Sequence, residues 1–171
     1  MTETKTSTIQ SKVIFSMDGK YRYYLEKVWD IEKKIATVIM INPSIADELK
    51  MDISVCKLMN FLIDTDDKKY GSLRIVNLYA QISSEPKKIK NNVIDVEILN
   101  DKYILESLKE TDLVIVAWGI EKNKYTTRKK KIYEMLKNNN ISIKGFKDKD
   151  GRIGRHPSRI NDFILDNYSY E

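Results

Sequence analysis

The stretch IATVIMINPS, residues 35–44, decides how the rest of this 171-residue sequence is interpreted. Its first seven residues are apolar apart from Thr37, as expected for a strand that is covered on both faces of a sheet. Asn42, Pro43 and Ser44 then end the strand in a tight polar turn, and Asp47 follows closely. Two interpretations are open: ordinary turn and capping chemistry, or a functional loop at the mouth of a sheet.

Three other apolar runs look like strands of the same sheet: SLRIVNLYA at 72–80, LVIVAW at 113–118 and a shorter run at 141–146. Helical spacing of apolar residues lies between and after these runs. It predicts helices over residues 53–63, 93–108, 123–138 and 159–167, with a long loop over 81–92. Strands that alternate with helices favour a parallel sheet with helices on both faces.

The N-terminal part predicts an antiparallel hairpin. Asp18-Gly19 is a strong turn signal, and it separates two strand-like segments at 13–16 and 21–29. Residues 1–12 are polar and predict a flexible arm, and residues 13–171 predict one α/β domain. The predicted fold is a three-layer α/β/α sandwich around a central, mainly parallel four-stranded sheet, with the hairpin added.

Composition excludes several classes of protein. The chain has one cysteine and one histidine, so an intramolecular disulfide is impossible and a zinc site of the usual kind is excluded. We expect no metal and no cofactor. The sequence has no long apolar span and no signal-peptide pattern, so we expect a cytoplasmic protein without membrane contact. Cys56, within the helix predicted at 53–63, is expected to be a small core residue.

The charge is unevenly distributed. Residues 120–160 hold 13 Lys and Arg against 4 Asp and Glu, whereas the remainder is net negative. A one-sided basic surface attracts polyanions, so nucleic acid or a free nucleotide is the expected partner. The alternative is a solvated helix face in a Lys-rich protein. The oligomeric state is left open.

Polar residues interrupt the apolar runs where the parallel strands end. Ligands of open α/β sheets bind beyond these carboxyl ends. Asn77, within Val-Asn-Leu, offers two donors and one acceptor that can read a nucleobase edge, or it pairs with a neighbouring backbone group. His156 can stabilise a developing oxyanion or act as an acid or base, or it caps the last helix.

The loop after the first core strand offers two more candidates. Asn42 could position a water molecule, and Asp47 could orient it or act as a general base. Asp52 and Ser54 compete for the helix-capping role, which would free Asn42 and Asp47 for other work.

The motif order resembles that of the uracil-DNA glycosylase superfamily. An apolar strand ends in Asn42-Pro43, a later strand carries Asn77, a strand end follows at Trp118-Gly119, and His156-Pro157-Ser158 comes last. The resemblance implies that Asn42 positions the attacking water, that Asn77 reads the base and that His156 supports the leaving base. Arg159 or Ile160 would stand where the superfamily places its wedge residue.

A closer resemblance covers nearly the whole chain. The sequence is similar to a prokaryotic and phage family of unknown function whose pattern combines Arg-Tyr-x-Leu, Asn-Pro-Ser-x-Ala-Asp, Asn-Leu, Trp-Gly and Gly-x-x-His-Pro. Here these motifs begin at Arg22, Asn42, Asn77, Trp118 and Gly154. This resemblance implies membership without a known activity.

The combined expectation is a DNA glycosylase-like protein that binds a nucleobase or nucleotide at the carboxyl edge of the sheet and hydrolyses an N-glycosidic bond. The alternative is a non-catalytic binder, or sponge, of a free nucleotide or nucleotide-derived signal in phage–host conflict. Candidate catalytic residues are Asn42, Asp47 and His156. Candidate base-binding residues are Pro43, Ser44, Asn77, Trp118, Gly119 and Ser158, and candidate phosphate-binding residues are Lys122, Arg128, Arg155 and Arg159.

Overall fold

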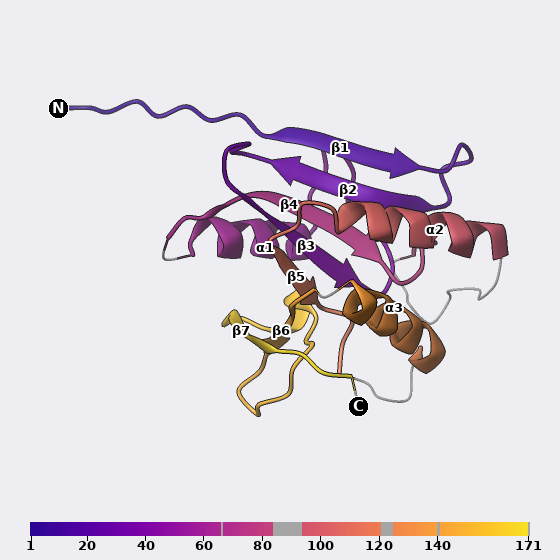
Figure 1. Cartoon of the computed structure of the whole chain (residues 1–171). Coiled ribbons are helices and arrows are strands. Elements are labelled where there is room, and N and C mark those ends of the chain that lie inside the picture. Colours follow the sequence, from indigo (N-terminus) through magenta and orange to yellow (C-terminus); the bar gives the residue numbers. More distant parts are fainter. Residues whose placement is uncertain (66, 84–93, 121–124, 140, 171) are drawn as a thin grey trace.

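A single mixed sheet forms the centre of the molecule (Figure 1). The computed structural model describes residues 1–65, 67–83, 94–120, 125–139 and 141–170. In these residues the sheet has seven strands, in the spatial order β1-β2-β4-β3-β5-β6-β7. They are β1 (Gln10–Phe15), β2 (Arg22–Val28), β3 (Lys34–Met40), β4 (Tyr70–Asn77), β5 (Leu113–Val116), β6 (Ile143–Lys147) and β7 (Ile164–Asn167).

The predicted central, mainly parallel four-stranded sheet with an added hairpin is wrong. β4, β3, β5 and β6 pair in parallel, but β2 pairs antiparallel with β4, and β7 pairs antiparallel with β6. The hairpin of β1 and β2 is therefore part of the same sheet. The pairing of Leu25 with Ile75 joins segments 50 residues apart in the chain, which local sequence patterns do not reveal.

Helices pack against both faces of the sheet (Figure 1). One face packs against α1 (Ile53–Ile63), and the other packs against α2 (Ile94–Ser107) and α3 (Thr126–Asn138). Strand alternation divides the core accordingly. Leu73 and Ile75 of β4 point to the α1 face, and Val76 points to the α2–α3 face.

Helix α1 has the predicted bounds, and its first residues explain them. The Oδ1 atom of Asp52 accepts a hydrogen bond from the backbone N–H of Val55 (2.8 Å), which makes Asp52 the N-cap. Val55, Leu58, Met59 and Leu62 form the buried stripe. Cys56 lies on the outer side of the helix and is exposed, so the prediction that it is a core residue is wrong.

The C-terminal segment differs from the prediction. The helix expected over 159–167 is absent, and a short 3-10 turn, Pro157–Arg159, is followed by β7. Phe163 and Leu165 pack against the core while Ile164 between them is exposed, which is strand alternation and not helical spacing. β6 offers an unpaired edge, and pairing with it decides the conformation.

The structure corrects the predicted N-terminal arm and describes only part of the loop predicted at 81–92. The N-terminal arm expected at 1–12 is shorter, because Gln10, Ser11 and Lys12 already belong to β1. Most of the loop predicted at 81–92 lies outside the described residues. No helix among the described residues combines the length and apolar character needed to cross a membrane.

Candidate functional site

Asn77 is the last residue of β4 and is 1% exposed. Because Leu73 and Ile75 point to the α1 face, alternation directs the Asn77 side chain to the same face. Its Nδ2 atom is buried and has no hydrogen-bond partner among the described residues. Its backbone oxygen, in contrast, accepts a hydrogen bond from Nδ2 of Asn100 (2.9 Å). The structure thus pairs the backbone of Asn77 and leaves its side-chain donor unused.

Arg22 lies at the same edge because β2 runs antiparallel to β4. The first residue of β2 is therefore near the point where β4 ends, and the backbone N–H of Arg22 donates to the oxygen of Ala80 (2.9 Å). The register between β1 and β2 skips Tyr23, which is the mark of a bulge. Arg22 contacts the loop before α1, whereas Tyr23 stacks on Tyr103 of α2.

The Arg22 side chain is buried against the loop that follows β3. Its Nη1 donates to the backbone oxygen of Ala46 (2.5 Å), and its Nε is buried without a hydrogen-bond partner in the described residues. Burial lowers the pKa of Arg22 to about 10, and the charges of Asp52 and Asp47 oppose that shift. A guanidinium held in this way is charged at neutral pH, and its Nε donor is unused within the described residues.

Asp52 connects three of the residues at this edge. Its Oδ2 accepts a hydrogen bond from the Oγ of Ser44 while its Oδ1 caps α1. Its charge acts on both Arg22 and His156, raising the pKa of each against the effect of burial. We call Arg22, Ser44, Asp52 and His156 the Asp52 cluster.

Sequence reasoning treated Asp52 only as a cap and Arg22 only as part of a motif. A search for functional residues at the carboxyl ends of strands misses Arg22. Because β2 runs antiparallel to β4, it is the first residue of β2 that lies at the carboxyl edge of the parallel strands. The available signal was the Arg22-Tyr23-Tyr24-Leu25 motif, in which a cation directly precedes an apolar strand.

His156 is half-buried and held by the turn that follows it. Its Nδ1 accepts a hydrogen bond from the backbone N–H of Ser158 (3.3 Å) and lies 2.9 Å from the Ser158 Oγ. Burial lowers the pKa of His156 below 6.5, the charge of Asp52 raises it and that of Arg159 lowers it. The imidazole is therefore neutral at pH 7. Since Nδ1 accepts, the proton lies on Nε2, which bonds to no described residue.

Asn42 and Asp47 are engaged with backbone groups. Nδ2 of Asn42 donates to the oxygens of Ser83 (2.6 Å) and Pro43 (3.0 Å), so both amide hydrogens are used and only Oδ1 remains. Oδ1 of Asp47 accepts from the backbone N–H groups of Lys50 (2.6 Å) and Leu49 (2.9 Å). These bonds lower the pKa of Asp47, which weakens it as a general base.

Trp118 lies away from the Asp52 cluster. It is 1% exposed in the core on the α2–α3 face, and its Nε1 donates to the hydroxyl of Tyr168 (2.9 Å). Gly119 has a positive φ of 83°, and its N–H donates to the oxygen of Gly154 (2.8 Å). This bond fastens the end of β5 to the loop before His156. The Trp-Gly motif thus stabilises the loop that carries His156 and does not contact the Asp52 cluster through Trp118.

The residues predicted to bind phosphate lie in different environments. Arg128 is 4% exposed, forms an ion pair with Asp101 and donates to the oxygen of Leu78 (2.7 Å), so it is part of the interior. Lys129 is also buried. Lys122 lies outside the described residues. Arg155 and Arg159 flank His156 and remain near the surface, where Arg155 lies 3.2 Å from the carboxylate of Asp148.

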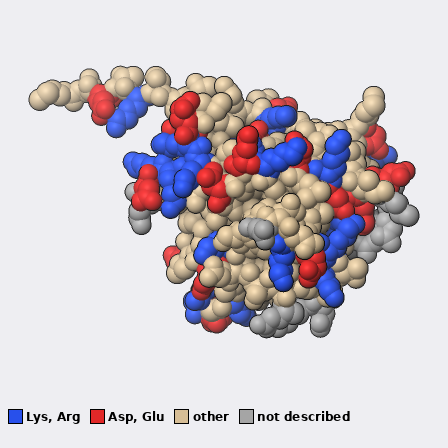
Figure 2. All heavy atoms as spheres, viewed as in Figure 1, with Lys and Arg blue, Asp and Glu red and all other residues tan. Residues whose placement is uncertain are grey.

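Burial of Arg128 and Lys129 removes two cations of the basic segment from the surface. On the side of the molecule that carries β1, α2 and α3, Lys and Arg side chains are interspersed with Asp and Glu (Figure 2). A mixed surface of this kind steers polyanions weakly.

The loop between β3 and α1, together with the first residue of α1, exposes large apolar side chains next to the Asp52 cluster. Ile45, Leu49, Met51 and Ile53 are 72%, 85%, 44% and 69% exposed. Scattered apolar side chains are normal at a surface, but four within nine residues form a concentrated apolar rim. The described residues contain no group of three or more His, Cys, Asp or Glu side chains that could hold a metal ion.

Comparison with known proteins gives a family and no activity. No curated protein and no solved structure matches the chain. The resemblance to the uracil-DNA glycosylase superfamily stays a prediction without support from these comparisons. A family model described as a protein of unknown function, DUF1643, matches residues 22–158, from Arg22 of the Asp52 cluster to Ser158 beside His156. The predicted membership of an uncharacterised family is thereby confirmed: the chain belongs to the DUF1643 family.

Proposed function

We propose that the protein binds a nucleobase or a nucleotide at the carboxyl edge of the sheet, on the α1 face. The observation that carries the proposal is Nδ2 of Asn77, a buried donor with no partner among the described residues. A buried unpaired polar group costs about 1–3 kcal/mol. A ligand acceptor at this point would remove that cost, and the edges of nucleobases carry such acceptors beside donors.

The neighbouring donors support the same ligand class. Nε of Arg22 is buried without a hydrogen-bond partner in the described part of the chain, and Nε2 of His156 carries a proton that no described residue accepts. Three donors on one side of the sheet favour a ligand rich in acceptor atoms. The apolar rim at Ile45, Leu49, Met51 and Ile53 provides side chains that can pack on a flat ring.

Hydrolysis of an N-glycosidic bond is the second candidate, and His156 favours it. A neutral imidazole with a proton on Nε2 can donate to negative charge that develops on a leaving base. Asp47 and Asn42 contribute little to activating water, because their side chains are bound to backbone groups. Asp52 acts electrostatically on His156, but both of its oxygens accept hydrogen bonds from Ser44 and Val55, so its role would be to orient and charge-balance the site. Binding without turnover, as in a nucleotide sponge, needs none of these steps.

Thermal unfolding in the presence of single nucleosides and nucleoside monophosphates tests the proposal. We expect one base to raise the Tm, since a ligand at 100 times its Kd stabilises the folded state by about 2.7 kcal/mol. Chromatography of the recovered ligand then separates the two candidates, because hydrolysis releases a free base. The proposal fails if no base at millimolar concentration shifts the Tm.

A further inference from the structure

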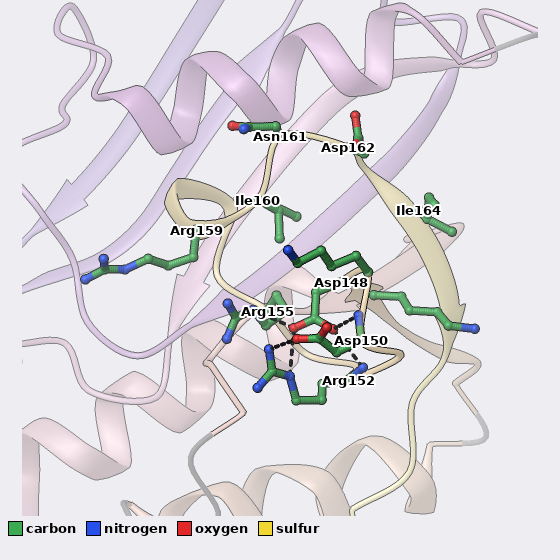
Figure 3. Close-up of a pocket in the computed structure, with 11 residues that line it drawn as sticks. Asp148, Asp150, Arg152, Arg155, Arg159, Ile160, Asn161, Asp162 and Ile164 are labelled. Atoms are coloured by element: carbon green, nitrogen blue, oxygen red, sulfur yellow. Dashed lines mark hydrogen bonds and ion pairs between the residues drawn. The ribbon is translucent and has the colours of Figure 1, made fainter.

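A second site adjoins the His156 turn. A cavity of about 370 Å³ lies between the loop after β6 and the segment that leads into β7. Figure 3 shows Asp148, Asp150, Arg152 and Arg155 gathered on one side, with Ile160, Asn161 and Asp162 on the other. The full lining is Lys147, Asp148, Lys149, Asp150, Arg152, Arg155, Arg159, Ile160, Asn161, Asp162 and Ile164.

The cavity lining has an excess of positive charge. Five cationic and three acidic side chains line it, which leaves a net charge of +2. Asp148 is shared by Arg152 and Arg155, at 2.9 Å and 3.2 Å from its Oδ2. The second of these contacts lacks hydrogen-bond geometry, so Nε of Arg155 is a buried donor without a hydrogen-bond partner among the described residues. Asp148 thus fixes two guanidinium groups without using all their donors.

Two further cations on the lining lack an ion-pair partner among the described residues. Lys149 and Arg159 form no ion pair with any described residue, whereas Lys147 is paired with Asp166 (2.9 Å). Asp162, on the opposite wall, is the acidic lining residue that has no cationic partner in the described part of the chain. The cavity therefore combines free positive charge with one opposing carboxylate, and both can be tested by substitution.

One lining residue of the cavity, Arg159, belongs to the same turn as His156 of the Asp52 cluster. The backbone N–H of Arg159 donates to the oxygen of His156 (2.9 Å), so the two residues belong to one turn. Their side chains also interact electrostatically. His156 does not itself line the cavity, so Arg159 is the residue that links the two places.

We propose that this cavity binds the phosphate group of the ligand whose base occupies the site at the sheet edge. The inference rests on the proposed function and narrows it from bases in general to phosphorylated ligands. Planar guanidinium groups match phosphate oxygens in geometry, and the apolar stem of Ile160 shields one side. The phosphate can belong to a free nucleotide or to a phosphodiester strand, since both present the same oxygens.

The test compares three ligands that carry the same base: nucleoside, nucleoside 5′-monophosphate and a short single-stranded oligonucleotide. Calorimetry measures each Kd for the wild type and for Arg159→Gln. We expect Arg159→Gln to weaken the phosphorylated ligands about tenfold and to leave the nucleoside unchanged. Asp162→Asn should act in the opposite direction and tighten them about twofold. Lys130→Gln, an exposed change of equal charge on α3, is the control.

The outcomes separate the two proposals. Equal affinity of wild type for nucleoside and monophosphate would overturn the phosphate site while the base site stands. Binding of none of the three ligands would overturn both. An equal loss in Lys130→Gln would also overturn the phosphate site, because the effect would be one of general charge. A loss for the oligonucleotide and the monophosphate supports the site, and the tighter of the two identifies the source of the phosphate.

Discussion

The unpaired side-chain amide of Asn77 predicts that one substitution will raise folding stability and abolish ligand binding. Asn77→Leu keeps a similar volume and removes a buried donor that has no partner among the described residues. We expect the free energy of unfolding to rise by about 1 kcal/mol and ligand binding to be lost. Urea denaturation and calorimetric titration measure the two effects.

Asn100 supplies the matched control for this prediction. Its Nδ2 donates to the backbone oxygens of Asn77 (2.9 Å) and Leu78 (3.1 Å). Asn100→Leu removes both bonds and should lower the free energy of unfolding by about 2 kcal/mol. If Asn77→Leu destabilises the protein as much as Asn100→Leu does, the Asn77 side chain is structural and our site assignment is wrong.

His156, the only histidine, predicts a specific pH dependence. Burial lowers its folded pKa below the ordinary value of 6.5, with the charge of Asp52 acting against this and that of Arg159 with it. Between the folded pKa and 6.5 the unfolded chain binds more protons than the folded one. Stability should therefore fall as the pH falls through this window. The Tm measured from pH 7.5 to pH 5 checks it.

The variant His156→Asn isolates this contribution. Asn cannot titrate, so its Tm should change less over the same window than that of the wild type. Carboxylates titrate mostly below the window and affect both proteins alike. Parallel curves for the two proteins would show that His156 is not held neutral by its surroundings.

At the scale of elements, α1 was predictable and the C-terminal segment was not. The signals for α1 are local in the sequence. Asp52 is the N-cap that marks where the helix begins, and the apolar stripe at helical spacing shows how far it extends. Residues 159–167 contain too few apolar positions to distinguish the spacing of a helix from the alternation of a strand. Pairing with β6 then selects the strand. The same contrast holds for the site: Asn77 and His156 follow from strand ends, whereas Arg22 depends on the position of β2 beside β4.

Asp52 has two roles in α1, and paired substitutions separate them. Asp52→Asn retains a side-chain oxygen for the cap but removes the charge opposite buried Arg22. Asp52→Ala removes both and should cost about 1 kcal/mol more in the free energy of unfolding, which is a typical capping contribution. Urea denaturation at pH 7 compares the two variants with the wild type. Equal loss in both would show that the cap contributes nothing beyond the charge.

At the scale of the whole molecule, the charge excess of residues 120–160 was the least reliable guide. Sequence counting treats each Lys and Arg as exposed, but Arg128 and Lys129 are buried and other cations are matched by acids. At the proposed phosphate cavity, Lys149 and Arg159 form no ion pair with any described residue, whereas Lys147 is paired with Asp166 and two arginines are held by Asp148. A localised group and a broad basic face differ in how binding responds to salt.

The salt dependence of oligonucleotide binding distinguishes a localised group of cations from a broad basic face. Each phosphate contact with a single strand contributes about 0.7 to the slope of log K against log salt concentration. The two cations without an ion-pair partner in the described residues therefore predict a slope of about −1.4 for a short single-stranded oligonucleotide, and Arg159→Gln should make it shallower by about 0.7. Fluorescence anisotropy between 50 and about 300 mM salt measures both slopes. A slope steeper than about −5 would require a wide basic surface, and a slope near zero would mean that the strand is held by its base alone.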